Sequence, residues 1–280
     1  MAARRRAHYS GAMNTQLLPV GEQVRHWRQR RRLSQLDLAC EAEISTRHLS
    51  FIETGRAAPS REMILHLAES LDVPLRQRNA LLLAAGFAPV FQERSLDDPA
   101  LRPAREALEA LLGAHEPYPA LAVDRHWNLI AANRAIGALM TGAALELMKP
   151  PVNVLRLSLH PAGLAPRIAN LPEWRDHLLF RLRRQYAETA DPALADLLAE
   201  LTAYPHGGTR AKAHDLAAIA VPLQLRTEYG VLSLLSATMM FGTPLDPTLS
   251  ELALETFLPA DAATAEALHR LAVERGDAPR

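Results

Sequence analysis

The apolar positions of the first ninety residues recur at helical spacing in five short segments. The first predicted helix covers residues 20–33, with Val24 and Trp27 on its inner side. A serine suited to capping a helix, or a proline, precedes each of the next four segments; these residues are Ser34, Ser45, Ser60 and Pro74. Gly86 ends the last segment. The pattern predicts an all-α domain of five short helices.

The rest of the chain combines strand-like and helical patterns. Two apolar segments, at residues 119–124 and 127–132, predict a β-hairpin that turns at Arg125-His126. The further predicted elements are helices at 104–115, 133–140, 171–204 and 262–272, and strands at 216–224 and 231–241. A hairpin, then helices, then a returning pair of strands predicts an α+β domain.

A proline-punctuated and charged segment separates the two patterns. We therefore predict a multidomain chain, and its 280 residues suit two ordinary domains. The predicted parts are a flexible tail at 1–18, an all-α domain at 19–88, a linker at 89–104 and an α+β domain at 105–275.

Charge is unevenly distributed although the formal net charge is zero. Residues 1–90 hold 13 Lys/Arg against 8 Asp/Glu, and the remainder carries the opposite imbalance. A basic front half joined to an acidic rear half suits a DNA-binding head and a separate effector domain.

Several classes of protein are disfavoured by composition. Cys40 is the only cysteine, so no intrachain disulfide forms and no oxidising compartment is indicated. There is no apolar run long enough for a membrane span, and the basic N-terminus lacks the apolar core of a signal peptide. We expect a cytoplasmic protein that does not bind a membrane.

The second and third predicted helices have the chemistry of a helix-turn-helix. The second helix of such a pair must enter a major groove about 12 Å wide, and its partner must pack closely across it. Ala39 provides a small contact residue, while Leu49 and Ile52 point to the core. Short or polar side chains are placed on the groove face; these are Thr46, Arg47, His48 and Ser50.

Residues across this region resemble those of the Cro/C1-type (XRE) regulators, which implies a five-helix, lambda-repressor-like DNA-binding domain. The resemblance covers about fifty residues at the correct spacing, unlike a lone short motif. The matching residues are Arg28, Leu33-Ser34-Gln35, Leu38-Ala39, Ile44-Ser45, Leu49, Ile52-Glu53, Gly55-Arg56, Pro59-Ser60 and Leu67-Ala68. Such heads usually read operator DNA as homodimers.

The resemblance also assigns roles to individual residues. Gln35 is expected to contact backbone and base, and Arg47 suits a guanine edge. The full predicted DNA-binding set is Gln35, Ser45, Thr46, Arg47, His48, Ser50 and Arg56. For His48 the alternative is a contact to phosphate alone. Arg28 and Glu53 resemble a structural ion pair between the first and third helices, whereas other members of the run 28–32 are either a solvated face or phosphate contacts.

One position departs from the family pattern. The turn between the two helices often carries glycine, and Glu43 occupies that position here. A non-glycine residue in the left-handed region costs about 1 kcal/mol, which a packed domain can absorb. The departure therefore leaves the assignment intact.

The rear half resembles the MmyB-like ligand-binding domain, a PAS-like fold, over about residues 105–270. The resemblance rests on the predicted hairpin that feeds an Asn-capped helix, and on the segments Asn153-Val154-Leu155-Arg156-Leu157, His160-Pro161, Asn170-Leu171-Pro172-Glu173-Trp174, Gly242-Thr243-Pro244-Leu245-Asp246 and Phe257-Leu258-Pro259-Ala260-Asp261. It implies a small sheet, surrounding helices and an apolar cavity for a ligand that is fatty-acid-like in one interpretation.

Candidate ligand contacts follow from that resemblance; they are Leu121, Val123, Trp127, Asn133 and Phe241. Each apolar member taken alone is better suited to an ordinary core, and Asn133 suits the cap of its helix. Arg156 or Arg181 could pair with a carboxylate head group, or each could form a salt bridge within the protein.

No catalytic pattern accompanies these features. The histidines have no metal-ligand spacing, and neither a nucleophile elbow nor a phosphate-cradling glycine loop is present. We therefore expect no enzyme, no metal and no cofactor beyond the possible bound apolar ligand. The leading hypothesis is a ligand-responsive transcription regulator that binds double-stranded operator DNA; the alternative is an antitoxin-like or scaffolding module with a protein partner.

Overall fold

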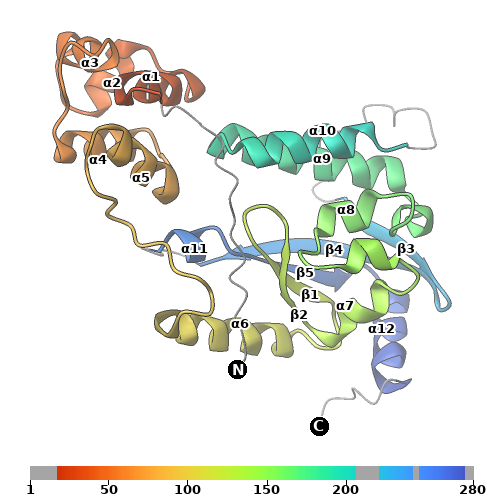
Figure 1. The fold of residues 1–280 in the computed structure, drawn as a ribbon. Coiled ribbons are helices and arrows are strands. Elements are labelled where there is room, and N and C mark those ends of the chain that lie inside the picture. The colour runs from red at the N-terminus through yellow and green to blue at the C-terminus, as the bar shows by residue number, and fades with distance from the viewer. Residues whose placement is uncertain (1–17, 206–220, 242–245, 275–280) are drawn as a thin grey trace, which may run out of the picture. The chain divides into compact units, whose positions relative to one another are not determined.

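The computed structural model describes residues 18–205, 221–241 and 246–274, and the chain forms two compact units, 1–90 and 91–280 (Figure 1). Most of the predicted tail at 1–18, and the first part of the strand predicted at 216–224, lie outside the described residues. The first unit is all-α and the second contains both strands and helices. The predicted multidomain fold class is thereby confirmed.

The first unit consists of five helices; they are α1 (Val20–Arg30), α2 (Gln35–Glu41), α3 (Thr46–Glu53), α4 (Arg61–Ser70) and α5 (Leu75–Ala84). The predicted serine caps are present, since the side chains of Ser34, Ser45 and Ser60 each accept a backbone N–H three residues later. The first helix ends earlier than predicted. Arg32 takes a left-handed conformation with φ 59°, which ends the helix.

The core of this unit is formed by aliphatic side chains at helical spacing; the largest fully buried ones are Leu38, Leu49, Ile52, Ile64, Leu67, Leu71, Leu81 and Leu82. Gly21 lets α1 approach the end of α3 closely, because a Cβ atom there would lie 2.1 Å from the carbonyl oxygen of Ile52. Any larger residue at that position would push the two helices apart.

The second unit begins before the predicted α+β domain. Residues 91–104, where a linker is expected, belong to this unit, and within them Leu101 is buried and Arg94 pairs with Asp246 at 3.1 Å. The elements up to the middle of the unit are the 3-10 turn η1 (Pro99–Leu101), α6 (Arg102–Ala114), β1 (Ala120–Val123), β2 (Leu129–Ala132), α7 (Arg134–Leu139), η2 (Leu145–Met148), α8 (Val154–Leu159) and η3 (Ala165–Arg167).

Two longer helices and the remaining strands complete the unit; the elements are α9 (Leu171–Thr189), α10 (Pro192–Ala203), β3 (Leu223–Thr227), β4 (Gly230–Met240), α11 (Pro247–Ser250), β5 (Ala253–Pro259) and α12 (Ala262–Glu274). The five strands form one antiparallel sheet in the order β2-β1-β5-β4-β3. The last strand of the chain thus lies at the centre of the sheet.

The two faces of the sheet are covered differently. Figure 1 shows α9 and α10 on one side of the sheet and α6 on the other. The α9 side holds the main core, which includes leucines of α8, α9 and α10 and both Trp127 and Trp174. On the α6 side, Leu108 and Leu112 pack on Ala120 and Ala122 in a smaller cluster. The larger of the two cores is therefore the one that can enclose a ligand.

Candidate functional site

The first unit contains a helix-turn-helix formed by α2, a short turn and α3. Ala39 is 2% exposed where the two helices meet, and the backbone N–H of Ile44 bonds back to its carbonyl at 2.9 Å. Glu43 has φ 49°, so the prediction of a non-glycine residue in the left-handed region is confirmed. The compact turn fixes the direction in which α3 leaves α2.

The outward side of α3 carries polar side chains. Arg47 and His48 are exposed, and Thr46 and Ser50 are half-buried, whereas Leu49 and Ile52 are buried in the core. This is the division that a helix needs when one side packs and the other meets a groove.

Phe51 supports two of the predicted DNA-binding side chains. The guanidinium carbon of Arg47 lies 5.3 Å from the centre of its ring, and that of Arg56 lies 5.9 Å away. Cation–π contacts of this kind hold a guanidinium at low entropic cost. The sequence signal for this residue is an aromatic one helical turn after an arginine.

Two other predicted contacts also have roles within the fold. The hydroxyl of Ser45 accepts the backbone N–H of His48 at 3.1 Å and so caps α3. The Nε2 group of Gln35 donates to Oε2 of Glu53 at 2.8 Å. Both residues therefore help to hold α3 in the position from which it presents Arg47.

A buried ion pair ties α1 to the end of α3, as the sequence predicts. Nε of Arg28 donates to Oε1 of Glu53 at 2.6 Å, and Nη2 donates to Oε2 at 2.9 Å. Burial by itself would raise the pKa of Glu53, but the hydrogen bonds from Arg28 and Gln35 outweigh it and hold that pKa below its usual value. Arg31 is structural too, since it donates to the carbonyl of Leu71 at 2.8 Å.

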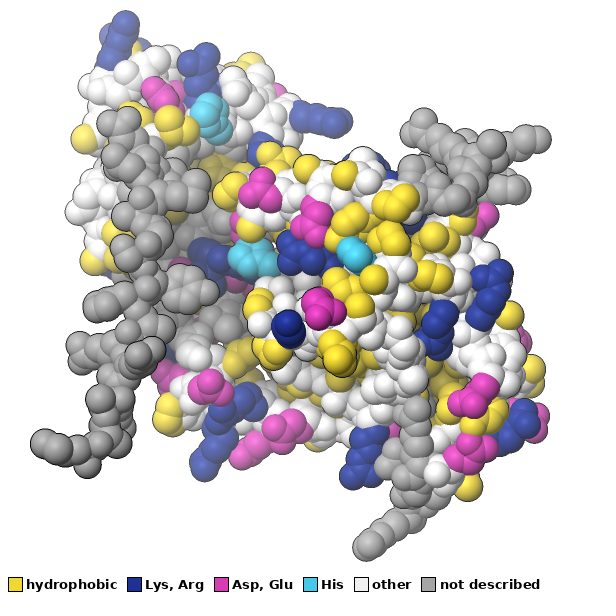
Figure 2. Space-filling model, turned by 45° about the vertical axis from the view of Figure 1, so that its right-hand side comes forward, with side chains coloured by type: hydrophobic (Ala, Val, Ile, Leu, Met, Phe, Trp, Pro, Cys, Tyr) yellow, Lys and Arg dark blue, Asp and Glu magenta, His cyan; other side chains and the backbone are white. Residues whose placement is uncertain are grey.

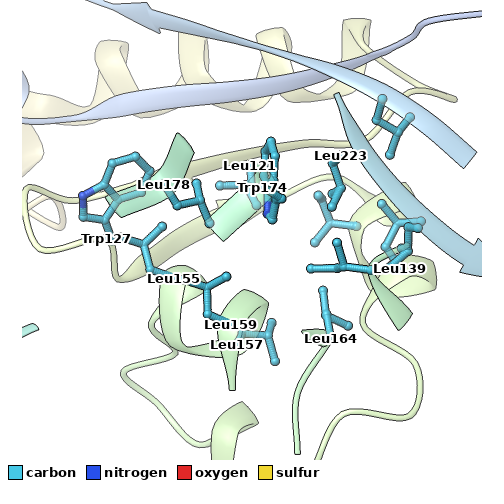
Figure 3. Close-up of a cluster of buried hydrophobic side chains, with 14 of the residues drawn as sticks. Leu121, Trp127, Leu139, Leu155, Leu157, Leu159, Leu164, Trp174, Leu178 and Leu223 are labelled. Carbon is cyan, nitrogen blue, oxygen red and sulfur yellow. The ribbon is translucent and has the colours of Figure 1, made fainter. Parts of the chain in front are cut away.

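The second unit encloses an apolar cavity of about 90 Å³ between the sheet and its covering helices (Figure 3). Its apolar lining comes from six elements and the loop before β2, with Leu121, Leu155, Trp174, Leu178 and Leu223 among the residues labelled in the close-up. Among the described residues, three with polar side chains other than Trp127 reach the wall, and they are Ser158, Arg181 and Glu255.

The five predicted ligand contacts occupy different places. Leu121 and Trp127 line the cavity, and Val123 belongs to the surrounding core. Phe241 packs against the smaller cluster on the α6 side of the sheet, because it follows the end of β4.

The side chain of Asn133 is engaged with the backbone. Its Oδ1 accepts the N–H of Ala120 at 3.1 Å, and its Nδ2 donates to the carbonyl of Tyr118 at 2.7 Å. It occupies the N-cap position of α7 without making the expected side-chain cap bond. Asn133 therefore ties the start of α7 to β1 and does not line the cavity.

Trp127 lies at one end of the cavity and has a strained backbone conformation. Its φ of 65° lies in the left-handed region, which costs about 1 kcal/mol for such a residue. The indole N–H donates to Oε1 of Gln185 at 2.7 Å, and the Arg181 guanidinium lies 4.9 Å from the ring centre. These contacts with α9 fix the ring against the cavity.

The two charged side chains of the cavity wall, Arg181 and Glu255, neutralise each other. Arg181 donates to both carboxylate oxygens of Glu255, at 3.1 and 2.6 Å, and Thr238 donates to Oε1 of the same carboxylate at 2.8 Å. Arg156 likewise pairs with Glu200, at 2.7 Å. Both arginines considered for a ligand head group thus form salt bridges within the protein.

His177 lies close to this ion pair. Burial lowers its pKa, the positive charge of Arg181 lowers it further, and Glu255 acts in the opposite direction. The ring stacks on Trp174 with 5.4 Å between centroids, and its Nε2 atom is buried without a hydrogen-bond partner among the described residues. The neutral form of this histidine is therefore favoured.

In the part of the chain that the structure describes, no group of three His, Cys, Asp or Glu side chains could hold a metal ion. No helix there is long and apolar enough to cross a membrane. Figure 2 shows acidic, basic and apolar side chains interspersed on one face of the molecule.

Two family models match the chain, one in each unit. A model of the MmyB-like transcription regulator ligand binding domain matches residues 104–271, and a model of a helix-turn-helix domain matches residues 19–81. No curated protein matches the chain significantly. Because the first model covers more than half of the chain, the protein belongs to the MmyB-like transcription regulators, in which a DNA-binding helix-turn-helix domain accompanies a ligand-binding domain.

Proposed function

We propose that this regulator senses an apolar, fatty-acid-like molecule that binds in the cavity between the sheet and α8 and α9. The observation that carries the proposal is the cavity wall, which is apolar except for Ser158 and the ion pair of Arg181 and Glu255. A wall whose charges already neutralise each other favours an apolar chain over a polar ligand, since a polar ligand would leave its own groups unpaired.

The cavity is small, which supports the proposal that it widens when the ligand binds. Its volume of about 90 Å³ equals that of about three waters in the liquid, whereas sites for small molecules usually measure about 300–1,000 Å³. A chain-like ligand therefore requires the cavity to widen. A ligand that binds only the wide form shifts the protein toward it, and this differential affinity is what allows binding to control a second site.

We further propose that the head reads DNA as a homodimer, through two half-sites about one helical turn apart. The surface that would make the contacts is formed by the exposed side of α3 and its surroundings; the residues are Gln35, Ser45, Thr46, Arg47, His48, Ser50 and Arg56. Arg47 is proposed for a guanine edge because its guanidinium is exposed and positioned by Phe51.

The test for the ligand is extraction of the purified protein with organic solvent, followed by mass spectrometry. We expect one class of apolar molecule at a fixed ratio to wild-type protein. Leu155→Phe, which adds volume beside the void, should abolish it, whereas Leu111→Phe on the exposed side of α6 should not. Equal recovery from both variants would mean that the molecule binds elsewhere, and that the cavity is ordinary core.

A further inference from the structure

A second hollow in the rear domain opens to the surface. It measures about 450 Å³, within the usual size of a ligand site, and lies between the end of α7, η3, the β3–β4 turn and α12. Its walls carry apolar and charged groups, including Leu139, Arg167, Arg226, Glu228 and Tyr229. We call it the α7 cleft.

Leu139 separates the α7 cleft from the buried cavity. It is the last residue of α7, is 6% exposed, and lines both hollows. In Figure 3, Leu139 and Trp127 lie at opposite ends of the cluster of labelled side chains. The cavity therefore runs from the Trp127 end toward a wall that includes the side chain of Leu139.

Arg167 holds that wall in place. Its Nη1 donates to the carbonyls of Leu139 at 3.0 Å and Thr141 at 2.5 Å, and its Nε donates to the carbonyl of Arg226 at 3.2 Å. The last carbonyls of a helix have no partners within the helix, so this clamp is a main tie between the end of α7 and β3. A ligand that accepted hydrogen bonds from the Arg167 guanidinium in place of these carbonyls would loosen the segment that carries Leu139.

The α7 cleft holds two guanidinium groups that could donate hydrogen bonds to an anion. Arg226 is exposed on β3, and no hydrogen-bond partner of its guanidinium is found among the described residues. Two carboxylates lie near these arginines: Glu228 is exposed in the cleft, and Glu274, at the end of α12, accepts a hydrogen bond from the hydroxyl of Tyr229. A carboxylate or similar head group could accept hydrogen bonds from both guanidinium groups.

We propose that the α7 cleft is the entrance to the cavity, and that the ligand is an amphiphile with an anionic head and a single apolar tail. The head binds Arg167 and Arg226 in the cleft, while the tail passes Leu139 into the cavity. This inference rests on the proposed function. A head group placed at Arg181 instead would have to take that guanidinium from Glu255 and leave a buried carboxylate unpaired, which is unfavourable.

The first test compares an anionic probe with a neutral one on the full chain. Decanoate and 1-decanol share a tail, and Trp127 and Trp174 on the cavity wall report binding through their fluorescence. Arg226→Ala should weaken decanoate about tenfold, as expected for the loss of a charge-assisted hydrogen bond, and leave decanol within about twofold. Glu228→Gln should tighten decanoate about twofold, because it removes the opposing charge.

Each other outcome has a distinct meaning. If decanoate binds but Arg226→Ala does not change its affinity, the head group lies elsewhere, and the proposal that the cleft is the entrance is wrong. If only Arg181→Leu abolishes the preference for decanoate over 1-decanol, the head group lies inside the cavity. If neither probe binds the wild-type cavity, the proposed function itself fails together with this inference.

The second test concerns Leu139 as the gate between the α7 cleft and the cavity. Leu139→Ala should raise the association rate of both probes several-fold in stopped-flow fluorescence, since it removes the wall between cleft and cavity. Leu159→Ala is the matched control, because Leu159 is equally buried in the same core but does not line either hollow. Equal rates in the two variants, checked for folding by thermal melts, would contradict a gate at Leu139.

Discussion

The two domains build their sites from the sequence in opposite ways. The candidate DNA-binding residues all lie between residues 35 and 56, on two helices and a loop. The lining of the cavity is drawn from residues between 121 and 257, and it includes both β1, the first strand of the domain, and β5, the last strand described. Local patterns therefore decide the first site, whereas tertiary packing decides the second.

The difference extends to how the two domains use charge. In the head, the buried pair of Arg28 and Glu53 fixes the orientation of a helix. In the rear domain, the pair of Arg181 and Glu255 lies in a cavity wall and crosses from α9 to the central strand. The first pair serves the packing of the fold alone, and the second also shapes the proposed ligand site.

The largest expected effect is on the stability of the head. Glu53→Ala leaves the Arg28 charge buried without a partner and should cost about 3–5 kcal/mol. Hydrogen exchange should show α1 to α3 losing protection while α9 keeps its own. The exposed substitution Gln29→Ala on α1 should leave both domains unchanged. Loss of protection in both domains with Glu53→Ala would mean that they do not fold independently.

Two glycines provide a matched pair, one in each domain. A Cβ at Gly21 would lie 2.1 Å from the carbonyl oxygen of Ile52, and one at Gly163 would lie 2.2 Å from that of Leu157. Each alanine substitution should therefore destabilise its own domain by about 1–3 kcal/mol, measured by denaturant unfolding. Gly113→Ala in α6, where a Cβ meets nothing within 4 Å, should instead stabilise by up to about 1 kcal/mol.

Arg47→Ala tests the head as a reader of sequence. On DNA selected from a random library, it should cost about 1–3 kcal/mol of binding free energy and relax the preference at one base position. Phe51→Leu should give a smaller loss, about 0.5–1 kcal/mol, because it removes the ring that positions Arg47 and Arg56. An equal loss on every sequence with Arg47→Ala would make Arg47 a phosphate contact.

The smallest effect expected is a difference in acid sensitivity. Since the folded-state pKa of His177 is held below the ordinary value of 6.5, the unfolded chain binds the proton more readily, and the rear domain loses stability as pH falls below about 6.5. Glu53 has a lowered pKa, so its contribution to the head is present above the ordinary value of 4.5 and is lost as pH falls below it.

Unfolding measured from pH 7 to pH 5 should therefore weaken the rear domain before the head. His177→Gln should flatten this dependence, and His269→Gln, at an exposed position of α12, should not. A dependence that is the same in wild type and His177→Gln would assign the effect to other groups.

The head could be predicted almost completely because its signals are local. Serine caps, helical spacing and the pairing of Arg28 with Glu53 all act over one or two helices, and the left-handed residue at Glu43 falls where the family turn requires it. The structure was needed for the support of Arg47 by Phe51 and for the bond from Gln35 to Glu53. It was also needed for the earlier end of α1 and for the close approach of the helices at Gly21.

In the rear domain, the hairpin and the helical character of residues 171–204 were predictable. The single helix predicted there was wrong, because Ala190 takes a left-handed conformation and Asp191 caps a new helix, so that α9 and α10 are separate. The central strand β5 was not predicted. Glu255 and Thr256 interrupt its apolar pattern, and both are buried because Arg181, Thr238 and the neighbouring strands satisfy them. From sequence alone a polar residue is assigned to the surface, because the distant partner that satisfies it when it is buried is not known. The roles of Asn133 and Phe241 depend in the same way on contacts made across the sheet.

In the proposed regulator, occupancy of the cavity changes the affinity of the head for DNA. The most direct measurement is the Kd for selected DNA, by fluorescence anisotropy, with and without decanoate at a concentration that saturates the tryptophan signal. We predict a shift of at least about fivefold in wild type, in the range of allosteric coupling, and none in Leu155→Phe. An unchanged Kd in wild type at saturating decanoate would contradict the claim.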